Sequence, residues 1–160
     1  MTRLPVLPQK FPYNEMLLND QRQFETRNWS WSYRGPLLFY TSSTNVNLVC
    51  KAYDYDPKEY EHQVIVAKAV LFDVRELTNK EKAFALHQLN PDMSKAEICD
   101  FVRYGLMEDN RIFPGDYGFF FCGLERIKPR KIKYPRGAIN VFWLNEHDAS
   151  PFQKFFNPAS

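Results

Sequence analysis

The segment from Phe24 to Ser43 constrains the fold more than any other part of the chain, because an alternating stretch is followed there by strand-forming residues. Residues 25–33 alternate charged or aromatic side chains with small polar ones. An extended chain places alternate side chains on opposite faces. One face of this predicted strand would carry Glu25, Arg27, Trp29, Trp31 and Tyr33. Residues 33–36 predict a turn, and Leu37–Thr41 predicts a buried strand that ends in hydroxyl side chains.

Two interpretations of this face stay open. In the first it is a binding surface, because a guanidinium binds phosphate or a base edge and aromatic rings stack on bases. In the second, the two tryptophans fill a core and Glu25 pairs with Arg27. The binding interpretation adds four candidate ligand contacts from the same region: Arg22, Arg34, Ser42 and Ser43.

The second half of the chain predicts a long strand, two helices and two more strands. Val64–Val74 is dense in β-branched residues and predicts the long strand, with Lys68 facing solvent. Two capping-box spacings predict the helices, Thr78 with Glu81 and Ser94 with Glu97. The later strands are expected over residues 117–127 and 137–144, with bends at Gly118 and Gly123.

The first half contains shorter signals. Tyr13–Asn19 predicts a short helix after a proline-punctuated lead. Residues 47–53 fit either a helical turn or a strand, and the acidic, tyrosine-rich stretch that follows, up to His62, predicts an exposed loop.

Length and charge favour one domain without an overall affinity for polyanions. A chain of 160 residues can bury a core without disulfides or metal. We expect a single domain over residues 1–160, with its core at about 11–144 and a short extension over 145–160. The formal charge of +2 is too small to attract nucleic acid over the whole surface, so any such affinity requires local clustering.

One such cluster lies between the last two predicted strands. Its members are Arg126, Lys128, Arg130, Lys131, Lys133 and Arg136, with no acid among them. Six cations along a hairpin favour a phosphate backbone, with salt-sensitive affinity. The alternative is an edge hairpin that lysines protect from aggregation.

The sequence predicts no metal, cofactor or membrane segment. Cys50, Cys99 and Cys122 are scattered, and no His or Cys stands at a metal-ligand spacing from another. The N-terminus lacks the apolar core of a signal peptide, and the apolar run Val64–Phe72 is too short to span a bilayer. We therefore expect a soluble, cytoplasmic protein.

The order of several motifs resembles the ASCH domain family, which is part of the PUA-like superfamily. Glu25-Thr26-Arg27 resembles the family's Glu-x-Arg element, and Tyr33–Leu38 resembles its Arg-Gly strand. Val64–Val74 resembles the middle strand. Gly115-Asp116-Tyr117 and Ile127-Lys128-Pro129 resemble parts of the closing strand pair. Each motif is short, and their order over most of the chain carries the resemblance.

The resemblance implies an α+β, mainly β fold: a small PUA-like barrel of about five or six strands with flanking helices. It also implies a cleft beside the Glu-x-Arg segment and a role in binding RNA or a nucleotide. Tyr117 and Lys128, which lie in the matching motifs, complete the candidate ligand-binding residues. Some relatives are hydrolases, but the Gly and Lys of the family motif are replaced here by Asp20 and Arg22. An arginine stays protonated and cannot act as the base that such a lysine provides.

Three functions follow from these observations. The leading hypothesis is a non-catalytic binder of RNA or a nucleotide. The second is a metal-independent nuclease or nucleoside hydrolase, with Glu25 as general acid or base beside Arg27, Lys68 or Lys128. The third is a protein-interaction domain that uses the acidic loop Tyr53–His62.

Overall fold

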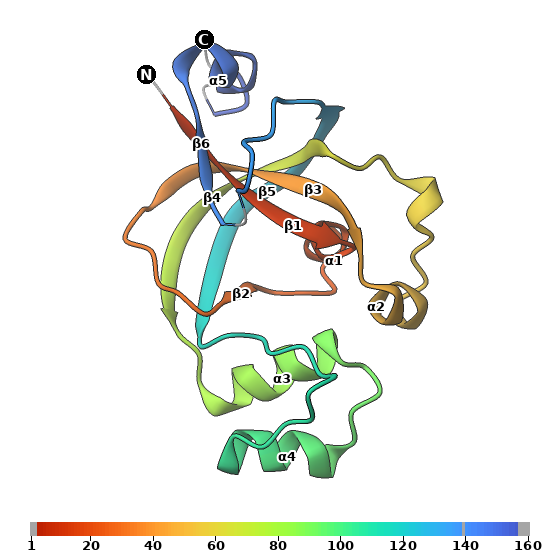
Figure 1. The fold of residues 1–160 in the computed structure, drawn as a ribbon. Coiled ribbons are helices and arrows are strands. Elements are labelled where there is room, and N and C mark those ends of the chain that lie inside the picture. Colours follow the sequence, from red (N-terminus) through yellow and green to blue (C-terminus); the bar gives the residue numbers. More distant parts are fainter. Residues whose placement is uncertain (1–2, 139, 157–160) are drawn as a thin grey trace.

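The protein has a mixed α+β fold, built on one six-stranded sheet with helices around it (Figure 1). The computed structural model describes residues 3–138 and 140–156. Its strands are β1 (Leu4–Phe11), β2 (Glu25–Arg27), β3 (Gly35–Asn45), β4 (Val64–Glu76), β5 (Tyr117–Arg130) and β6 (Phe142–Leu144). Its helices are α1 (Tyr13–Leu18), α2 (Asn47–Ala52), the 3-10 helix η1 (Pro57–Glu59), α3 (Asn79–Leu89), α4 (Lys95–Tyr104) and α5 (Glu146–Gln153).

The strands lie in the order β2-β5-β4-β3-β1-β6. Strands β1 and β3 pair in parallel, and the other neighbours are antiparallel. The hydrogen-bonded ladder ends at β2 on one side and β6 on the other, so the predicted number of strands is confirmed but the predicted closure into a barrel is not.

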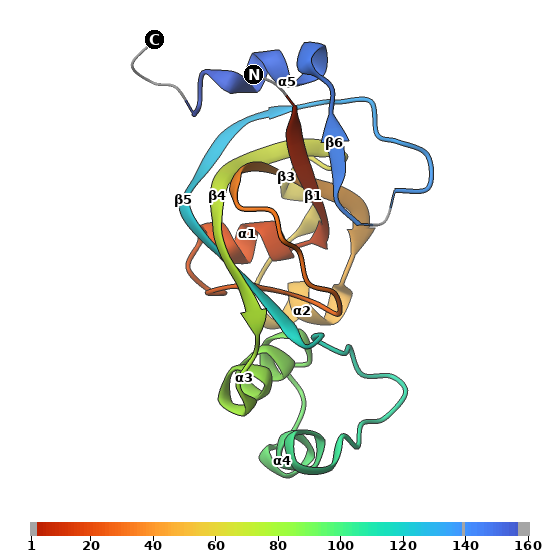
Figure 2. The same cartoon turned by 90° about the vertical axis from the view of Figure 1, so that its left-hand side faces the viewer.

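Bulges bend the two longest strands around the core (Figures 1 and 2). Three register shifts interrupt the pairing of β4 with β5. One of them spans Gly123, whose φ of +59° is a left-handed conformation that glycine adopts without a side-chain clash. The predicted bend at Gly123 is therefore confirmed.

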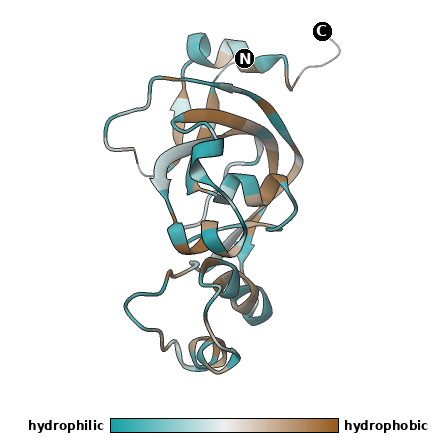
Figure 3. Ribbon diagram, turned by 90° about the vertical axis from the view of Figure 1, so that its right-hand side faces the viewer, coloured by the Kyte–Doolittle hydropathy of each residue, from teal (hydrophilic) through white to brown (hydrophobic). Residues whose placement is uncertain are grey.

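Strand β3 is buried on both faces, which explains its uninterrupted apolar run. Leu37 and Phe39 pack into one core cluster, while Leu38 and Tyr40 pack into another on the opposite face. Hydrophobic residues are concentrated in the strands of the sheet (Figure 3). A strand that is covered on both sides needs no polar alternation.

The two capping boxes also formed as predicted. The Thr78 hydroxyl accepts a hydrogen bond from the Glu81 amide, and the Glu81 carboxylate accepts one from the Thr78 amide. Ser94 and Glu97 do the same at the start of α4. These reciprocal bonds satisfy amides that a helix start leaves without partners.

Three local expectations were wrong. The predicted strand over residues 25–33 is paired only over β2, because the chain leaves the sheet after Arg27. Strand β1 was not expected, since prolines disfavour strand interiors; Pro8 is tolerated because it lies beyond Val6, the last residue that pairs with β6. The stretch up to His62 is not wholly exposed, because Tyr55 is buried.

The core extends past both ends of the range expected for it. Leu4 and Phe152 are each 1% exposed and belong to the same cluster. Of the predicted strand over residues 137–144, β6 forms only the last part, and residue 139 lies outside the described residues. The last four residues of the predicted C-terminal extension also lie outside them. No helix in the described ranges combines the length and apolar character that a membrane span requires.

Candidate functional site

A pocket of about 430 Å³ lies beside the Glu25–Arg27 strand. Its walls come from three strands: Pro8, Gln9 and Lys10 of β1, all of β2, and Ser42 and Thr44 of β3. Leu89 at the end of α3 and residues 112–114 of the loop before β5 close its apolar side. The hollow therefore has one polar and one apolar wall.

Glu25 lies at the polar wall and is 5% exposed. Its Oε1 accepts hydrogen bonds from Arg22 Nη2 at 3.1 Å and from the Thr26 amide at 2.7 Å. Its Oε2 lies 3.8 Å from Arg27 Nη2. Burial works to raise the pKa of Glu25, but the charges of Arg22 and Arg27 and these hydrogen bonds lower it below its ordinary value. The carboxylate is therefore ionised at neutral pH.

Arg22 is a buried ion-pair partner of Glu25. It is 3% exposed, its Nη1 donates to Gln9 Oε1 at 3.4 Å, and its guanidinium lies 5.0 Å from the centre of the Tyr13 ring. Arg22 is not among the residues that line the pocket. Its role in this geometry is to neutralise and orient Glu25, because a buried charge needs a partner.

Arg27 lies at the pocket wall and is held by the strand beside it. Its Nη2 donates to the Pro8 carbonyl at 2.8 Å. The loop before β5 passes close to the Arg27 backbone at Gly115. A Cβ on Gly115 would lie 2.4 Å from the Arg27 carbonyl oxygen. Only glycine allows that approach, which gives the Gly115-Asp116-Tyr117 motif a physical reason.

Two buried polar atoms on the pocket lining have no hydrogen-bond partner among the described residues. They are Gln9 Nε2 and the Tyr13 hydroxyl. Burial raises the pKa of Tyr13 to about 12, against the nearby Arg22 charge, so the phenol keeps its proton. A buried donor without a partner costs free energy, and a ligand with acceptor atoms would remove that cost.

The aromatic residues of the predicted binding face lie elsewhere. Trp29 meets the buried ring of Phe119 edge-on at 5.1 Å, and Trp31 stacks on Tyr33 at 4.8 Å. Tyr33 also meets Trp143 at 5.2 Å. None of the three lines the pocket beside Glu25. Their contacts favour the interpretation in which the rings fill a core.

The other predicted site residues are divided between several surfaces. Arg34 Nη1 donates to the carbonyls of Trp31 and Tyr33, and its Nη2 lies 3.8 Å from Asp73. Tyr117 pairs with Arg27 across β2 and β5. Lys128 is exposed on β5. Lys68 lies 3.7 Å from Glu125 and does not line the pocket, so the two catalytic candidates Glu25 and Lys68 are not brought together there.

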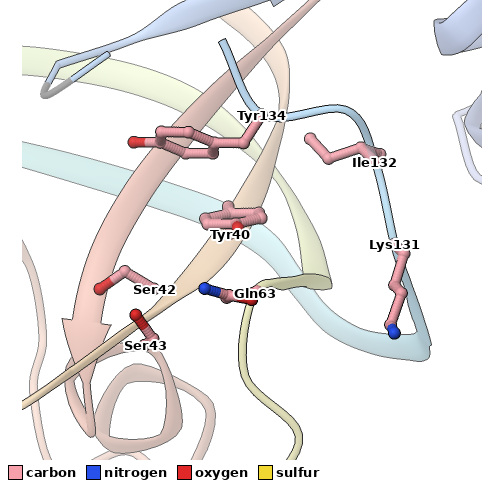
Figure 4. A pocket seen from close by; sticks show the side chains of 7 residues that line it. All are labelled: Tyr40, Ser42, Ser43, Gln63, Lys131, Ile132 and Tyr134. Carbon is pink, nitrogen blue, oxygen red and sulfur yellow. The ribbon is translucent and has the colours of Figure 1, made fainter. Parts of the chain in front are cut away.

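Ser42 and Ser43 lie at the entrance to a second hollow of about 390 Å³. Figure 4 shows this hollow, with Tyr134 over Tyr40 and with Gln63 and Lys131 at its sides. Ser42 and Tyr134 line both hollows, and Tyr134 is close enough to Arg27 for that charge to act on its pKa, which burial raises. Of the serines, only Ser42 reaches the pocket beside Glu25.

Of the residues that line the pocket, sequence reasoning had named Glu25, Arg27 and Ser42 as site residues and missed the others, among them Gln9, Tyr13, Phe113 and Tyr134. Gln9 was hidden because the prolines around it disfavour a strand. Tyr134 was hidden among the basic residues 126–136, where its alternation with exposed lysines was the available signal. Nothing in the local sequence of Tyr13 or Phe113 marks either as a pocket residue.

The described residues contain no cluster of His, Cys, Asp and Glu that could bind a metal ion. No family model matches the sequence, and no curated protein matches it.

The structure is similar to crystal structures of an ASCH protein from Zymomonas mobilis. One variant of that protein superposes with a TM-score of 0.54 over 94% of this chain and 94% of its own. The structure titled simply as the ASCH protein gives 0.52, over 94% and 93%, and a second variant gives 0.52, over 94% and 96%. The sequence identity is 8% in each case. This likeness shows the ASCH fold that the order of the motifs predicted.

Proposed function

We propose that the protein binds RNA or a nucleotide without catalysis, in the pocket beside Glu25 and Arg27. One observation carries the proposal: an ionised carboxylate, a guanidinium and two unpartnered buried polar atoms, Gln9 Nε2 and the Tyr13 hydroxyl, border the same hollow. A binding site of this kind is mostly apolar, with a few convergent polar groups that fix the ligand's orientation. The RNA-binding role that the ASCH resemblance implies agrees with it.

The pocket offers a contact for the edge of the base, for its face and for the phosphate. Glu25 accepts hydrogen bonds from an exocyclic amino group, and Gln9 donates to a ring nitrogen or carbonyl. Ile112 and the half-exposed ring of Phe113 offer apolar contact to the base. Lys10 and Arg27 supply positive charge for a phosphate. Bases with an exocyclic amino group, which are adenine, cytosine and guanine, should bind more tightly than uracil.

Binding is favoured over hydrolysis by the state of Glu25. A carboxylate with a lowered pKa is a weak base at neutral pH, and as an ionised group it has no proton to donate. Its ion-pair partners Arg22 and Arg27 are arginines, a side-chain type that does not serve as a general base. Lys68, the other catalytic candidate, does not line the pocket.

The experiment titrates the protein with the four ribonucleoside 5′-monophosphates by isothermal calorimetry. Lys10→Ala and Phe113→Ala remove exposed lining groups without opening the core. Each should weaken binding about tenfold, the loss of one charged contact or one aromatic face. Lys80→Ala and Phe72→Ala are the matched controls, since both residues are exposed and neither lines the pocket. The proposal fails if no nucleotide binds, or if the controls weaken binding as much as the pocket variants do.

A further inference from the structure

Three hollows are linked by the residues that line them. The pocket beside Glu25 shares Ser42 and Tyr134 with the hollow of Figure 4. That hollow shares Lys131 and Ile132 with a third one, of about 430 Å³, which reaches the start of α5. Each is large enough for a small-molecule group. Together they form one track, which leads from the Glu25 pocket to the basic segment after β5.

Cationic side chains are most numerous at the outer end of the track. Lys131 lines the second hollow, and Arg130, Lys131 and Lys133 line the third. All three are exposed, and none has a carboxylate within ion-pair distance among the described residues. Asp148 is the acid on the lining of the third hollow. Arg126 does not contribute, because Glu15 binds it in a bidentate pair at 2.7 and 3.2 Å.

The backbone of this segment explains why its lysines face outward. Ile132 and Tyr134 alternate with Lys131 and Lys133 and pack inward on the core cluster that contains Tyr40. Tyr134 lies 4.7 Å from the Tyr40 ring, and its hydroxyl donates to the Ala138 carbonyl at 2.5 Å. The inward contacts of Ile132 and Tyr134 hold the backbone that carries the cations beside the track.

We propose that the track binds a single-stranded polynucleotide, with one base in the Glu25 pocket and the phosphodiester backbone continuing past Ser42 and Ser43 to Lys131, Lys133 and Arg130. This proposal rests on the proposed function and names its ligand as a chain rather than a mononucleotide. Exposed cations beside the two outer hollows complement a chain of phosphates whose bases are unstacked. A mononucleotide would leave the two outer hollows and their cations unused.

The test compares Lys131→Ala/Lys133→Ala with the control Lys80→Ala/Lys95→Ala, in which two exposed lysines of α3 and its neighbour α4 are removed. Fluorescence anisotropy measures the affinity for labelled single-stranded RNA and DNA ten-mers at several salt concentrations. The track variant should bind RNA at least about tenfold more weakly, and the slope of log affinity against log salt should fall by about 1.4. The control should keep the affinity of the wild type, and the track variant should keep its affinity for mononucleotides.

Three results would overturn the track. The first is that both double variants bind the ten-mer with equal affinity. The second is that the wild type binds the ten-mer no more tightly than a mononucleotide, a result that leaves the proposed pocket intact. The third is that polyglutamate binds as tightly as the ten-mer. If the ten-mer binds and the lysine pair is required, but no mononucleotide binds, the track stands and the proposed pocket fails. Comparing the RNA and DNA ten-mers tests whether the protein contacts the 2′-hydroxyl of the sugar, because only RNA carries it.

Discussion

At the scale of single residues, Glu25 joins the stability of the fold to the proposed site. Its carboxylate is the partner of the buried Arg22 and is also part of the pocket wall. The binding interpretation therefore fits one part of the Glu25–Tyr33 segment, and the core interpretation fits the other. Glu25 and Arg27 lie at the pocket, whereas Trp29 and Trp31 pack on Phe119.

We predict that Glu25→Gln unfolds more easily than the wild type. Removing one member of a buried ion pair leaves the other charge uncompensated, which costs about 3–5 kcal/mol. Urea unfolding followed by tryptophan fluorescence at pH 7 measures the free energy of unfolding. Glu61→Gln is the control, because Glu61 is exposed and should change stability by less than about 0.5 kcal/mol. A loss below about 1 kcal/mol would show that Arg22 does not depend on Glu25.

The expected loss of stability in Glu25→Gln affects how a test of catalysis with this variant is interpreted. Loss of activity in Glu25→Gln alone would not separate a chemical role from loss of structure. The exposed variants Lys10→Ala and Phe113→Ala avoid that ambiguity, because neither residue holds a buried charge.

At the scale of elements, the start of α3 is held by a charge network that reaches back to β4. Arg75 donates from Nη1 and Nη2 to both carboxylate oxygens of Glu81, at 2.8 and 2.7 Å, and its guanidinium lies 4.4 Å from the Phe120 ring. The same carboxylate accepts from the Thr78 amide. The hydrogen bonds from Arg75 lower the pKa of Glu81 from 4.5 to about 2, against the opposing effect of burial.

We predict a pH-dependent stability difference between the wild type and Glu81→Gln. The folded pKa is lowered, so the ionised form stabilises the protein above pH 4.5, and this contribution disappears as the pH falls from 4.5 to about 2. Glutamine still completes the capping box, so the variant isolates the charge. At pH 7 it should lose about 1 kcal/mol, since the pair is partly exposed. Urea unfolding at pH 7 and pH 2.5 should show the gap closing, and a constant gap would contradict the pKa assignment. Glu76→Gln, at the exposed last residue of β4, should show no gap at either pH.

The elements that the sequence predicted correctly are those whose signals are local. Capping boxes and a β-branched run depend on neighbours within a few residues, so Thr78, Ser94 and Val64–Val74 fixed their elements correctly. Strand β1 was not predicted, because it depends on its partners β3 and β6, which are distant in sequence, and its prolines give no local strand signal. The alternation after Arg27 persists in the burial pattern, although that segment has no strand partner. Glu25 and Arg27, which the sequence marked as candidates, line the pocket, but its apolar wall includes residues 112–114, which only the folded chain brings there.

At the scale of the whole molecule, α3 and α4 form a lobe below the sheet (Figures 1 and 2). The lobe has its own small cluster of Leu86, Met93 and Phe101, and Phe101 is the buried residue of α4. Arg111 ties the lobe together, at 2.6 Å from Asp92 and 2.9 Å from Glu97. Since Leu89 and the loop of residues 112–114 line the Glu25 pocket, motion of the lobe would change the pocket's apolar wall.

We predict that α4 opens at a lower free energy than the sheet. An element with few buried apolar contacts exchanges its amides by local opening, whereas core strands exchange by global unfolding. Native-state hydrogen exchange in low urea should therefore show the amides of Lys95–Tyr104 exchanging before those of Val64–Glu76. Arg111→Gln removes the link between Asp92 and Glu97, so it should accelerate exchange in α4 and leave β4 unchanged. Equal opening free energies for α4 and β4, or an equal response of both to Arg111→Gln, would show that the lobe and the sheet unfold as one unit.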